Sequence, residues 1–253
     1  MLYRIIYLFA KVWFKNQISV KQFYGSKKIL YYKKSQHLGF LFQRSIKYEY
    51  EILTTIKPYV LKGGVVFDIG ANIGQYAIPF SELVGNEGKV YCFEPDPENF
   101  SFLQLNTTMN ACNNVCVINQ GVGDLETNLS FYRDTLQGGR MGSFIKSSVG
   151  SNFEGFEIKQ QVKKLDSLIK TYGVPDFIKV DVEGFEVEVV KGLTVDFENS
   201  VWLIEVRQNT KEFIFNYFYE RGYECRHIEN SNVLINNADE IPEFANLIFK
   251  KNI

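Results

Sequence analysis

The sequence predicts an α/β domain in which helices cover both faces of a mostly parallel β-sheet. From about Tyr48 onward, short apolar runs alternate with amphipathic stretches five or so times, and two strand-like runs close the chain. Alternation of this kind is typical of a parallel sheet that is covered on both sides. The chain has 253 residues, of which 45% are hydrophobic, so it can bury the single core that such a domain requires.

The strands are predicted from short runs of β-branched and aromatic residues. These runs lie at residues 65–69, 89–95, 115–119, 176–184 and 201–207. Helices are expected between them, at residues 48–60, 75–85, 96–110, 165–173, 185–193 and 211–223. Asp96 followed by Pro97 is typical of a helix N-cap and the first helical position. Residues 223–237 and 244–252 are expected to close the sheet as an antiparallel hairpin. A polar region at residues 121–159 interrupts the alternation and contains two strand-like pieces, at residues 129–133 and 156–162.

Charge is distributed unevenly along the chain. The first 50 residues contain ten basic side chains and one acid, Glu49, whereas the remaining residues contain 18 bases and 28 acids. A basic segment on an acidic body indicates a nearby anionic surface, either phospholipid head groups or an acidic glycan. A solvated, lysine-rich face would give the same pattern. The acidic body also argues against a groove for nucleic acid.

The first residues, "MLYRIIYLFAKVWF", are apolar and aromatic with two bases among them. This run is too short to span a bilayer, which needs ~20 apolar residues, and no small-residue cleavage site follows it. A helix docked on a membrane surface and a helix packed on the protein itself both fit the pattern. We therefore expect a helical N-terminal segment at residues 1–47, with peripheral membrane contact through residues 1–35 as one option, and the α/β domain at residues 48–253. The oligomeric state is not indicated.

The cysteine pattern predicts the compartment. The four cysteines, Cys92, Cys112, Cys116 and Cys225, form no disulfide framework. Cys112 and Cys116 have neither a second pair nor a histidine nearby, which disfavours a zinc site. Reduced thiols and the lack of an export signal predict a cytoplasmic protein, at the inner membrane face if the N-terminal segment docks there.

Acidic residues mark the expected ligand site. Four acids stand at or just after the ends of consecutive predicted strands: Asp68, Glu94, Asp124 and Asp181. The carboxyl ends of parallel strands meet at one edge of a sheet, where ligands bind. The turn after Asp68 has the spacing G-x-x-x-G, which is neither the G-x-G-x-x-G of a dinucleotide site nor a P-loop. It suits a ligand with a cationic amino-acid end, and Glu94 is positioned to accept hydrogen bonds from two ribose hydroxyls.

Several stretches together resemble a known family. "VVFDIGANIGQYAIPFS", "VYCFEPDPENFSFLQLN", "VGD", "LDSLI" and above all "DFIKVDVEGFEVEVVKGL" resemble the FkbM family of S-adenosylmethionine-dependent methyltransferases, over residues 48–207. The resemblance implies a class I methyltransferase (Rossmann-like) fold, whose sheet has seven strands in the order 3-2-1-4-5-7-6 with an antiparallel last strand. It also implies O-methylation of a hydroxyl on a sugar or another natural product. The two ends of the chain and residues 121–159 are then expected to select the acceptor.

The resemblance further implies which residues bind S-adenosylmethionine. They are Glu49, Asp68, Gly70, Ala71, Asn72, Gly74, Tyr76, Glu94, Pro95 and Asp124. Residues 68–76 match the loop that holds the methionine end, and Glu94 matches the acid that binds the ribose. Asp124 matches the acid that meets the adenine amine, and Glu49 matches a glutamate that closes over the cofactor.

Methyl transfer to oxygen is an in-line displacement, so alignment of the reacting atoms supplies much of the catalysis. A sugar hydroxyl is a poor nucleophile, and a base within hydrogen-bonding reach adds ~10²–10⁴-fold. Asp181 is the predicted base, with Glu183 orienting the hydroxyl and Glu205 as the third candidate. The alternatives are Glu183 as a helix cap, His227 as the base, and a divalent ion shared by the three acids, which nothing in the sequence requires. Glu186 is interpreted as a surface or structural residue of the following helix.

Rival functions fit the sequence less well. Nucleic-acid methylation is disfavoured because the fourth strand is followed by "DVEGF" in place of N-P-P-[YF], and because no Pro-Cys is present. The glycine spacing disfavours an oxidoreductase. A non-catalytic scaffold in a glycan assembly complex would be expected to have a decayed cofactor loop, and this loop is intact. The sequence therefore predicts an O-methyltransferase acting on a hydroxyl, most readily that of a sugar in a polysaccharide, glycolipid or other natural product.

Overall fold

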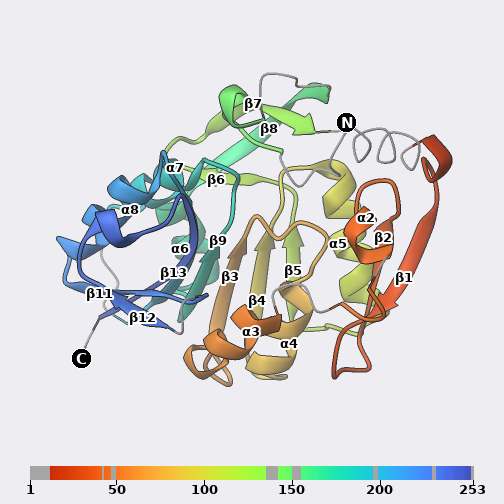
Figure 1. Ribbon diagram of the computed structural model, residues 1–253, viewed down its shortest axis with the longest axis horizontal. Helices are drawn as coiled ribbons and strands as arrows, with labels where there is room; N and C mark the ends of the chain where they lie inside the picture. Colours follow the sequence, from red (N-terminus) through yellow and green to blue (C-terminus); the bar gives the residue numbers. More distant parts are fainter. Residues whose placement is uncertain are drawn as a thin grey trace.

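A mixed sheet forms the centre of the protein, whose computed structural model describes residues 12–41, 43–46, 50–134, 142–149, 155–195, 199–229 and 232–251. Within these residues the sheet has eight strands: β3 (Val65–Ile69), β4 (Lys89–Phe93), β5 (Val115–Ile118), β9 (Phe177–Val180), β10 (Val201–Arg207), β11 (Tyr223–His227), β12 (Val233–Ile235) and β13 (Phe244–Lys251). Their order across the sheet is β12-β11-β13-β10-β9-β3-β4-β5 (Figure 1). The five strands from β5 to β10 run parallel, so their carboxyl ends share one edge.

The end of the chain closes the sheet with antiparallel strands. β13 inserts between β10 and β11 and is antiparallel to both, and β12 is antiparallel to β11. The α/β class with a mixed sheet is therefore confirmed, but the predicted count of seven strands is wrong for the described residues, which contain an eighth. The additional strand is β12. Its three apolar residues pair with β11 as a hairpin and cover an edge that would otherwise expose unpaired backbone groups.

Helices cover both faces of the sheet because successive strand residues point to opposite sides. Phe67 and Ile69 of β3 pack with α6 (Leu165–Tyr172), α7 (Glu186–Lys191) and α8 (Lys211–Tyr219). Val66 of the same strand packs with α3 (Tyr50–Ile56), α4 (Ala77–Val84) and α5 (Pro97–Met109). The predicted N-cap is confirmed, since Asp96 accepts hydrogen bonds from the backbone N–H groups of Glu98 and Asn99 at 2.7 and 3.2 Å.

Residues 121–164 form a separate, smaller sheet. Its strands are β6 (Gly121–Gly123), β7 (Thr127–Asp134) and β8 (Gly155–Lys164), in the order β6-β8-β7. This sheet lies beyond the ends toward which β3, β4 and β5 point (Figure 1). Because β6 belongs to the small sheet, Asp124 does not stand at the edge of the main sheet. The expectation that four acids meet at that edge is therefore wrong for Asp124.

The N-terminal segment contains strands where a helical segment was predicted. β1 (Ile18–Gln22) and β2 (Ile29–Lys33) pair antiparallel, and only the short α2 (Leu38–Leu41) and residues 12–13 are helical in the described part of this segment. The helical prediction rested on the apolar run at residues 1–14, of which 1–11 lie outside the described residues. The pattern of β2 has period two, and Leu30 and Tyr32 are fully buried against α4 and α5.

The outer edge of β2 is paired with side chains instead of another strand. The amide oxygens of Asn110 and Asn106 on α5 accept hydrogen bonds from the N–H groups of Ile29 and Tyr31, at 2.9 and 2.6 Å. The same two amides donate to the carbonyls of Ile29 and Tyr31. These contacts hold the N-terminal hairpin on the α/β domain. The proposed boundary at residue 47 lies outside the described residues.

Two further properties bear on the compartment. None of the helices in the described stretches is long and apolar enough to cross a bilayer. All four cysteines are free thiols, and Cys116 is the one that is exposed.

Candidate active site

A cavity of about 270 Å³ opens at the carboxyl ends of the parallel strands. Its walls come from the ends of β3, β4, β9 and β10, from the turn after β3, and from the small sheet. The predicted site residues that line it are Gly70, Ala71, Asn72, Tyr76, Glu94, Pro95, Asp181, Glu183 and Glu205. Asp68, Gly74 and Asp124 are not part of its lining, and Glu49 lies outside the described residues.

The turn after β3 is held tightly against the neighbouring strands. The N–H groups of Gly70 and Ala71 both donate to the carbonyl of Phe93 at the end of β4, at 2.9 and 3.1 Å. Gly70 has a φ of +81°, and a Cβ there would overlap the carbonyl oxygen of Asp181. Only glycine combines this φ with so close an approach. At Gly74 the absence of a side chain lets the turn pack closely against Leu103 of α5.

Glu94 presents a buried carboxylate to the cavity. Its Oε2 accepts from the N–H of Asn72 at 2.7 Å, and its Oε1 accepts from the N–H of Asp96 at 2.9 Å. Burial and the nearby charge of Asp96 raise the pKa of Glu94 to about 8, although those two backbone hydrogen bonds lower it. The turn and the second strand therefore fix this carboxyl in one orientation, as a site for a pair of hydroxyls requires.

Asp68 lies outside the cavity lining, behind Lys179. It is fully buried at the end of β3, and its Oδ1 lies 3.8 Å from Nζ of Lys179 on β9. The same ammonium lies 3.1 Å from Oδ2 of Asp181 and 4.7 Å from the centre of the Tyr76 ring. Lys179 lines the cavity, so the structure puts a cation between Asp68 and any ligand.

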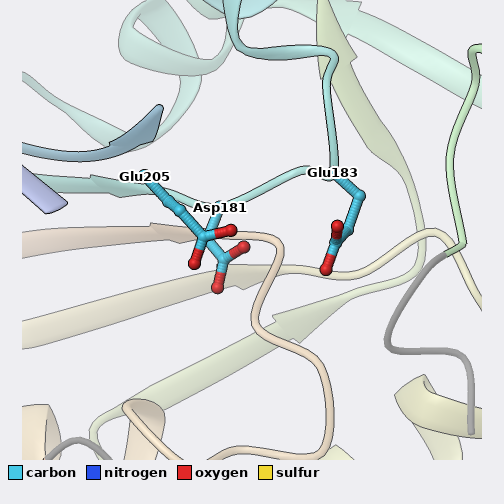
Figure 2. Close-up of side chains that lie close together, drawn as sticks. All are labelled: Asp181, Glu183 and Glu205. Carbon is cyan, nitrogen blue, oxygen red and sulfur yellow. The ribbon is translucent and has the colours of Figure 1, made fainter. Parts of the chain in front are cut away.

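The three predicted catalytic acids, which all line the cavity, lie close together (Figure 2). One carboxylate oxygen from each of Asp181, Glu183 and Glu205 lies within 4.8 Å of the others. Glu183 reaches this position through a left-handed turn, with φ of +54° at Glu183 and +95° at Gly184. A positive φ at a residue with a long side chain is uncommon and concentrates at functional sites.

Two cations neutralise the acid cluster. Nη2 of Arg207 pairs with Glu183 and lies 3.3 Å from Oε1 of Glu205, while Lys179 pairs with Asp181. Burial, together with the charges of Asp181 and Glu183, raises the pKa of Glu205 to about 9. Glu205 therefore keeps its proton at neutral pH and cannot act as a base there. Among the described residues, these three acids are the one group of ligating side chains that could hold a metal ion. In this structure Lys179 and Arg207 balance the negative charge that a metal ion would balance.

Several lining residues were missed by the sequence analysis. They are Gln75, Gln120, Phe131, Phe144, Lys179, Phe185, Arg207 and Phe244. Lys179 and Arg207 stand two positions from Asp181 and Glu205 on their strands, and strand periodicity would have identified both. Phe131 and Phe144 come from the insertion at residues 121–159, whose path over the cavity has no signal in the sequence.

Other candidates lie outside the cavity. His227, considered as an alternative base, is buried at the end of β11, with Nε2 3.2 Å from Oε2 of Glu229. The surface interpretation of Glu186 is wrong, because this residue is fully buried in the first turn of α7. Its Oε1 accepts from the N–H of Gly184 at 2.8 Å, which holds the turn that carries Glu183. Burial raises the pKa of Glu186 to about 7.

This buried carboxyl predicts a pH-dependent stability. A folded-state pKa of about 7 against 4.5 for the free group stabilises the protein at low pH, and this contribution is lost as the pH rises through 7. Glu186→Gln keeps the hydrogen bond and cannot ionise. Relative to wild type, its free energy of unfolding should therefore increase by about 3 kcal/mol between pH 5 and pH 8. Urea unfolding at both pH values measures this, with the exposed Glu212→Gln as the matched control. An equal difference at both pH values would contradict the burial effect.

Comparison with known proteins agrees with this geometry. Residues 68–225 match the methyltransferase FkbM domain. The chain is 28% identical over 155 residues to the hexuronic acid methyltransferase AglP of Haloferax volcanii, an alignment that covers 60% of this chain and 59% of that relative. The match thus spans less than two thirds of the relative's length.

Two solved structures share the fold. A methyltransferase FkbM from Methylobacillus flagellatus superposes with a TM-score of 0.50 at 18% identity, covering 75% of this chain and 44% of that one. A precorrin-6y C5,15-methyltransferase from Geobacter metallireducens superposes with the same TM-score of 0.50 at 13% identity, covering 82% of this chain and 90% of that one. Since the family match spans more than half of the sequence and includes the glycine turn, Glu94 and the acid cluster, the chain belongs to the FkbM methyltransferase family.

Proposed function

We propose that the protein is an S-adenosylmethionine-dependent O-methyltransferase that acts on a sugar hydroxyl. The observation that carries the proposal is that two different sets of groups line one cavity. The first set is Glu94 with the glycine turn, and the second is the acid cluster. The first suits the ribose and amino-acid parts of a nucleoside cofactor, and the second suits a hydroxyl that must lose its proton.

Charge supports a cationic cofactor. With Glu94 and Glu205 both protonated at neutral pH, the acids Asp68, Asp181 and Glu183 outnumber the cations Lys179 and Arg207 by one around the cavity. S-adenosylmethionine supplies a methyl group on a positively charged sulfur, which this negative excess favours. Glu94 would accept hydrogen bonds from its ribose hydroxyls, and the turn at residues 70–72 would contact its methionine end.

Asp181 remains our proposed base. Its carboxylate is partly exposed to the cavity, whereas Glu183 is tied to Arg207 and Glu205 is protonated at neutral pH. Asp181 would accept the proton of the acceptor hydroxyl as the hydroxyl oxygen takes the methyl group. Nζ of Lys179 donates to Oδ2 of Asp181 at 3.1 Å and would hold the carboxylate in place.

A sugar is the acceptor class that the lining supports. The cavity is lined by aromatic rings as well as by charged groups, and the rings are those of Phe131, Phe144, Phe185 and Phe244. A sugar ring offers one apolar face of C–H groups together with hydroxyls, which matches such a mixed lining. The related AglP is a hexuronic acid methyltransferase, which makes uronic acids the first acceptors to test.

Titration of S-adenosylmethionine into the protein tests the cofactor assignment. Wild type should bind, and Glu94→Ala should raise the Kd about tenfold or more, because the hydrogen bonds to two ribose hydroxyls are lost. Asp181→Asn should keep the Kd within about threefold of wild type, while methyl transfer to uronic and neutral glycosides falls by ~10²–10⁴-fold. Glu157→Ala, which removes an exposed carboxyl from β8, is the control. A folded wild type that does not bind would leave the non-catalytic scaffold as the better reading.

We also propose that the protein works in the cytoplasm and contacts anionic phospholipid at the membrane face through its N-terminal segment. Residues 12–46 contain seven basic side chains and no acid. Val12 and Trp13 are each 78% exposed, and Ile18 and Val20 point outward from β1. Exposed apolar side chains among lysines favour a surface with negative head groups.

Sedimentation with phospholipid vesicles tests the membrane contact. Wild type should pellet with phosphatidylglycerol vesicles and stay in solution with phosphatidylcholine, because the attraction is electrostatic. Ile18→Glu combined with Val20→Glu should lower the bound fraction severalfold. Val195→Glu, which changes an exposed valine outside the N-terminal segment, is the matched control. Wild type remaining in solution with anionic vesicles would contradict the proposal.

A further inference from the structure

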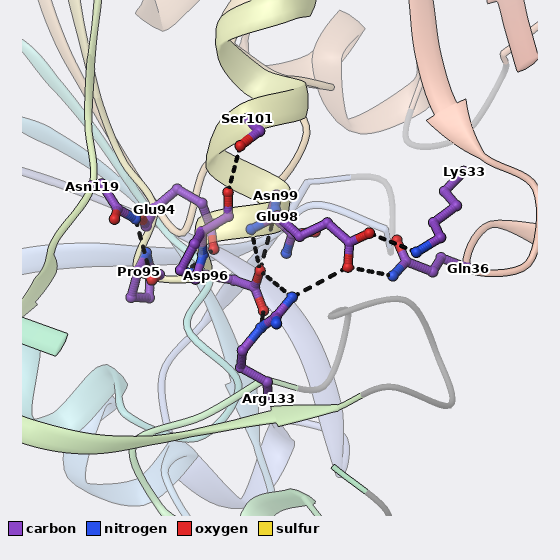
Figure 3. A network of polar contacts seen from close by, with 11 residues as sticks. Lys33, Gln36, Glu94, Pro95, Asp96, Glu98, Asn99, Ser101, Asn119 and Arg133 are labelled. Carbon is purple, nitrogen blue, oxygen red and sulfur yellow. Dashed lines mark hydrogen bonds and ion pairs between the residues drawn. The ribbon is translucent and has the colours of Figure 1, made fainter. Parts of the chain in front are cut away.

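A charged network joins the small sheet to the loop that carries Glu94 (Figure 3). Arg133 of β7 reaches the first turn of α5, where Nε and Nη2 donate to the two carboxylate oxygens of Asp96 at 2.6 and 3.0 Å. Nη2 also donates to Glu98 at 3.2 Å. This two-pronged contact fixes the position of a carboxylate in both distance and plane. β7 is thereby tied to the start of α5 across more than thirty positions of the sequence.

Asp96 is the member of the network that contacts Glu94. Its side chain is almost fully buried, caps α5, and is neutralised by Arg133. Its backbone N–H donates to Oε1 of Glu94. The orientation of the Glu94 carboxylate therefore depends on where the backbone of Asp96 lies. The charge of Asp96 also bears on Glu94 directly, because it is one of the causes that raise the pKa of that carboxyl.

The N-terminal segment braces the same turn from its other side. Lys33 and Gln36 donate to the carboxylate oxygens of Glu98 at 2.7 and 3.0 Å. These contacts are about one quarter to one third exposed, whereas the Asp96 side chain is 1% exposed. Exposed pairs contribute little, while breaking a buried pair leaves an uncompensated charge. Arg133 is therefore the partner whose loss should matter most.

We propose that Arg133 is a positioning residue for cofactor binding, acting through Asp96 to hold Glu94 in its ligand-accepting orientation. The proposal rests on the proposed function, because it assumes that Glu94 binds the cofactor ribose. Phe131 stands two positions before Arg133 on β7, on the same face of the strand, and lines the cavity. One strand thus contributes both to the aromatic wall for the acceptor and to the support of the cofactor acid, so the insertion does more than select the acceptor.

Calorimetric titration of S-adenosylmethionine into the full chain tests this role. Arg133→Gln should raise the Kd about tenfold, equivalent to ~1.4 kcal/mol. Lys163→Gln is the matched control, because it removes a cation from an exposed pair with Glu126 in the same small sheet. It should leave the Kd within about twofold of wild type. Arg133→Lys keeps the positive charge but cannot donate to both oxygens of Asp96 from a planar group, so it should give an intermediate Kd.

A double variant separates positioning from general destabilisation. In Arg133→Gln the carboxylate of Asp96 stays buried without its partner, next to Glu94. Adding Asp96→Asn removes that charge while an amide oxygen remains to cap α5. The double variant should therefore bind S-adenosylmethionine more tightly than Arg133→Gln alone, under conditions where urea unfolding shows both variants to be fully folded, so that the difference in Kd does not come from the folded fraction. If Arg133→Gln does not fold, Arg133→Lys and its double variant with Asp96→Asn give the same comparison.

The outcomes are distinguishable. An Arg133→Gln protein that binds like wild type, or a double variant that binds no better than the single one, overturns the positioning role and leaves the proposed function standing. A folded wild type that does not bind S-adenosylmethionine overturns both.

Discussion

The contact between the backbone at Gly70 and the carbonyl of Asp181 is the constraint on which the rest of the site depends. β3 and β9 lie side by side in parallel register, with Ile69 opposite Val180, so the turn after β3 must pass over the first residue beyond β9. No side chain fits between them, and the φ of Gly70 excludes most residues as well. The crossing brings the glycine turn and the acid cluster together in one cavity, although more than a hundred residues separate them.

The second feature of the site is that several ionisable side chains are buried. Glu94, Glu186 and Glu205 are all held in surroundings that oppose ionisation, whereas Asp181 and Glu183 each have a cation against them. Such groups lower stability unless each is protonated, paired or hydrogen-bonded. The arrangement therefore costs folding energy and leaves a modest negative excess around the cavity, which comes from Asp68 behind it. That excess is what a positively charged cofactor would offset.

The sequence predicted the parts of the site that follow from parallel strand packing. Asp68, Glu94 and Asp181 could be assigned to one edge because strand ends in a parallel sheet coincide, and Asp96 could be assigned as a cap from its local pattern. Asp124 was assigned to the wrong sheet edge because β6 pairs with β8 in the small sheet. This pairing is long-range and cannot be predicted from the local sequence. Lys179 and Arg207 were not predicted as site residues, because only the acids at the strand ends were considered as ligand-binding groups. The N-terminal hairpin was also unforeseen, since β2 completes its edge with side-chain amides of α5 that lie about eighty residues away.

A crystal structure of the protein with S-adenosylhomocysteine would test the proposed roles of the cavity residues most directly. We predict that the ribose hydroxyls lie within hydrogen-bonding distance of the Glu94 carboxyl group, that the amino-acid end contacts the turn at residues 70–72, and that the sulfur faces Asp181. A nucleoside bound elsewhere, or bound in the cavity with its ribose away from Glu94, would contradict these roles.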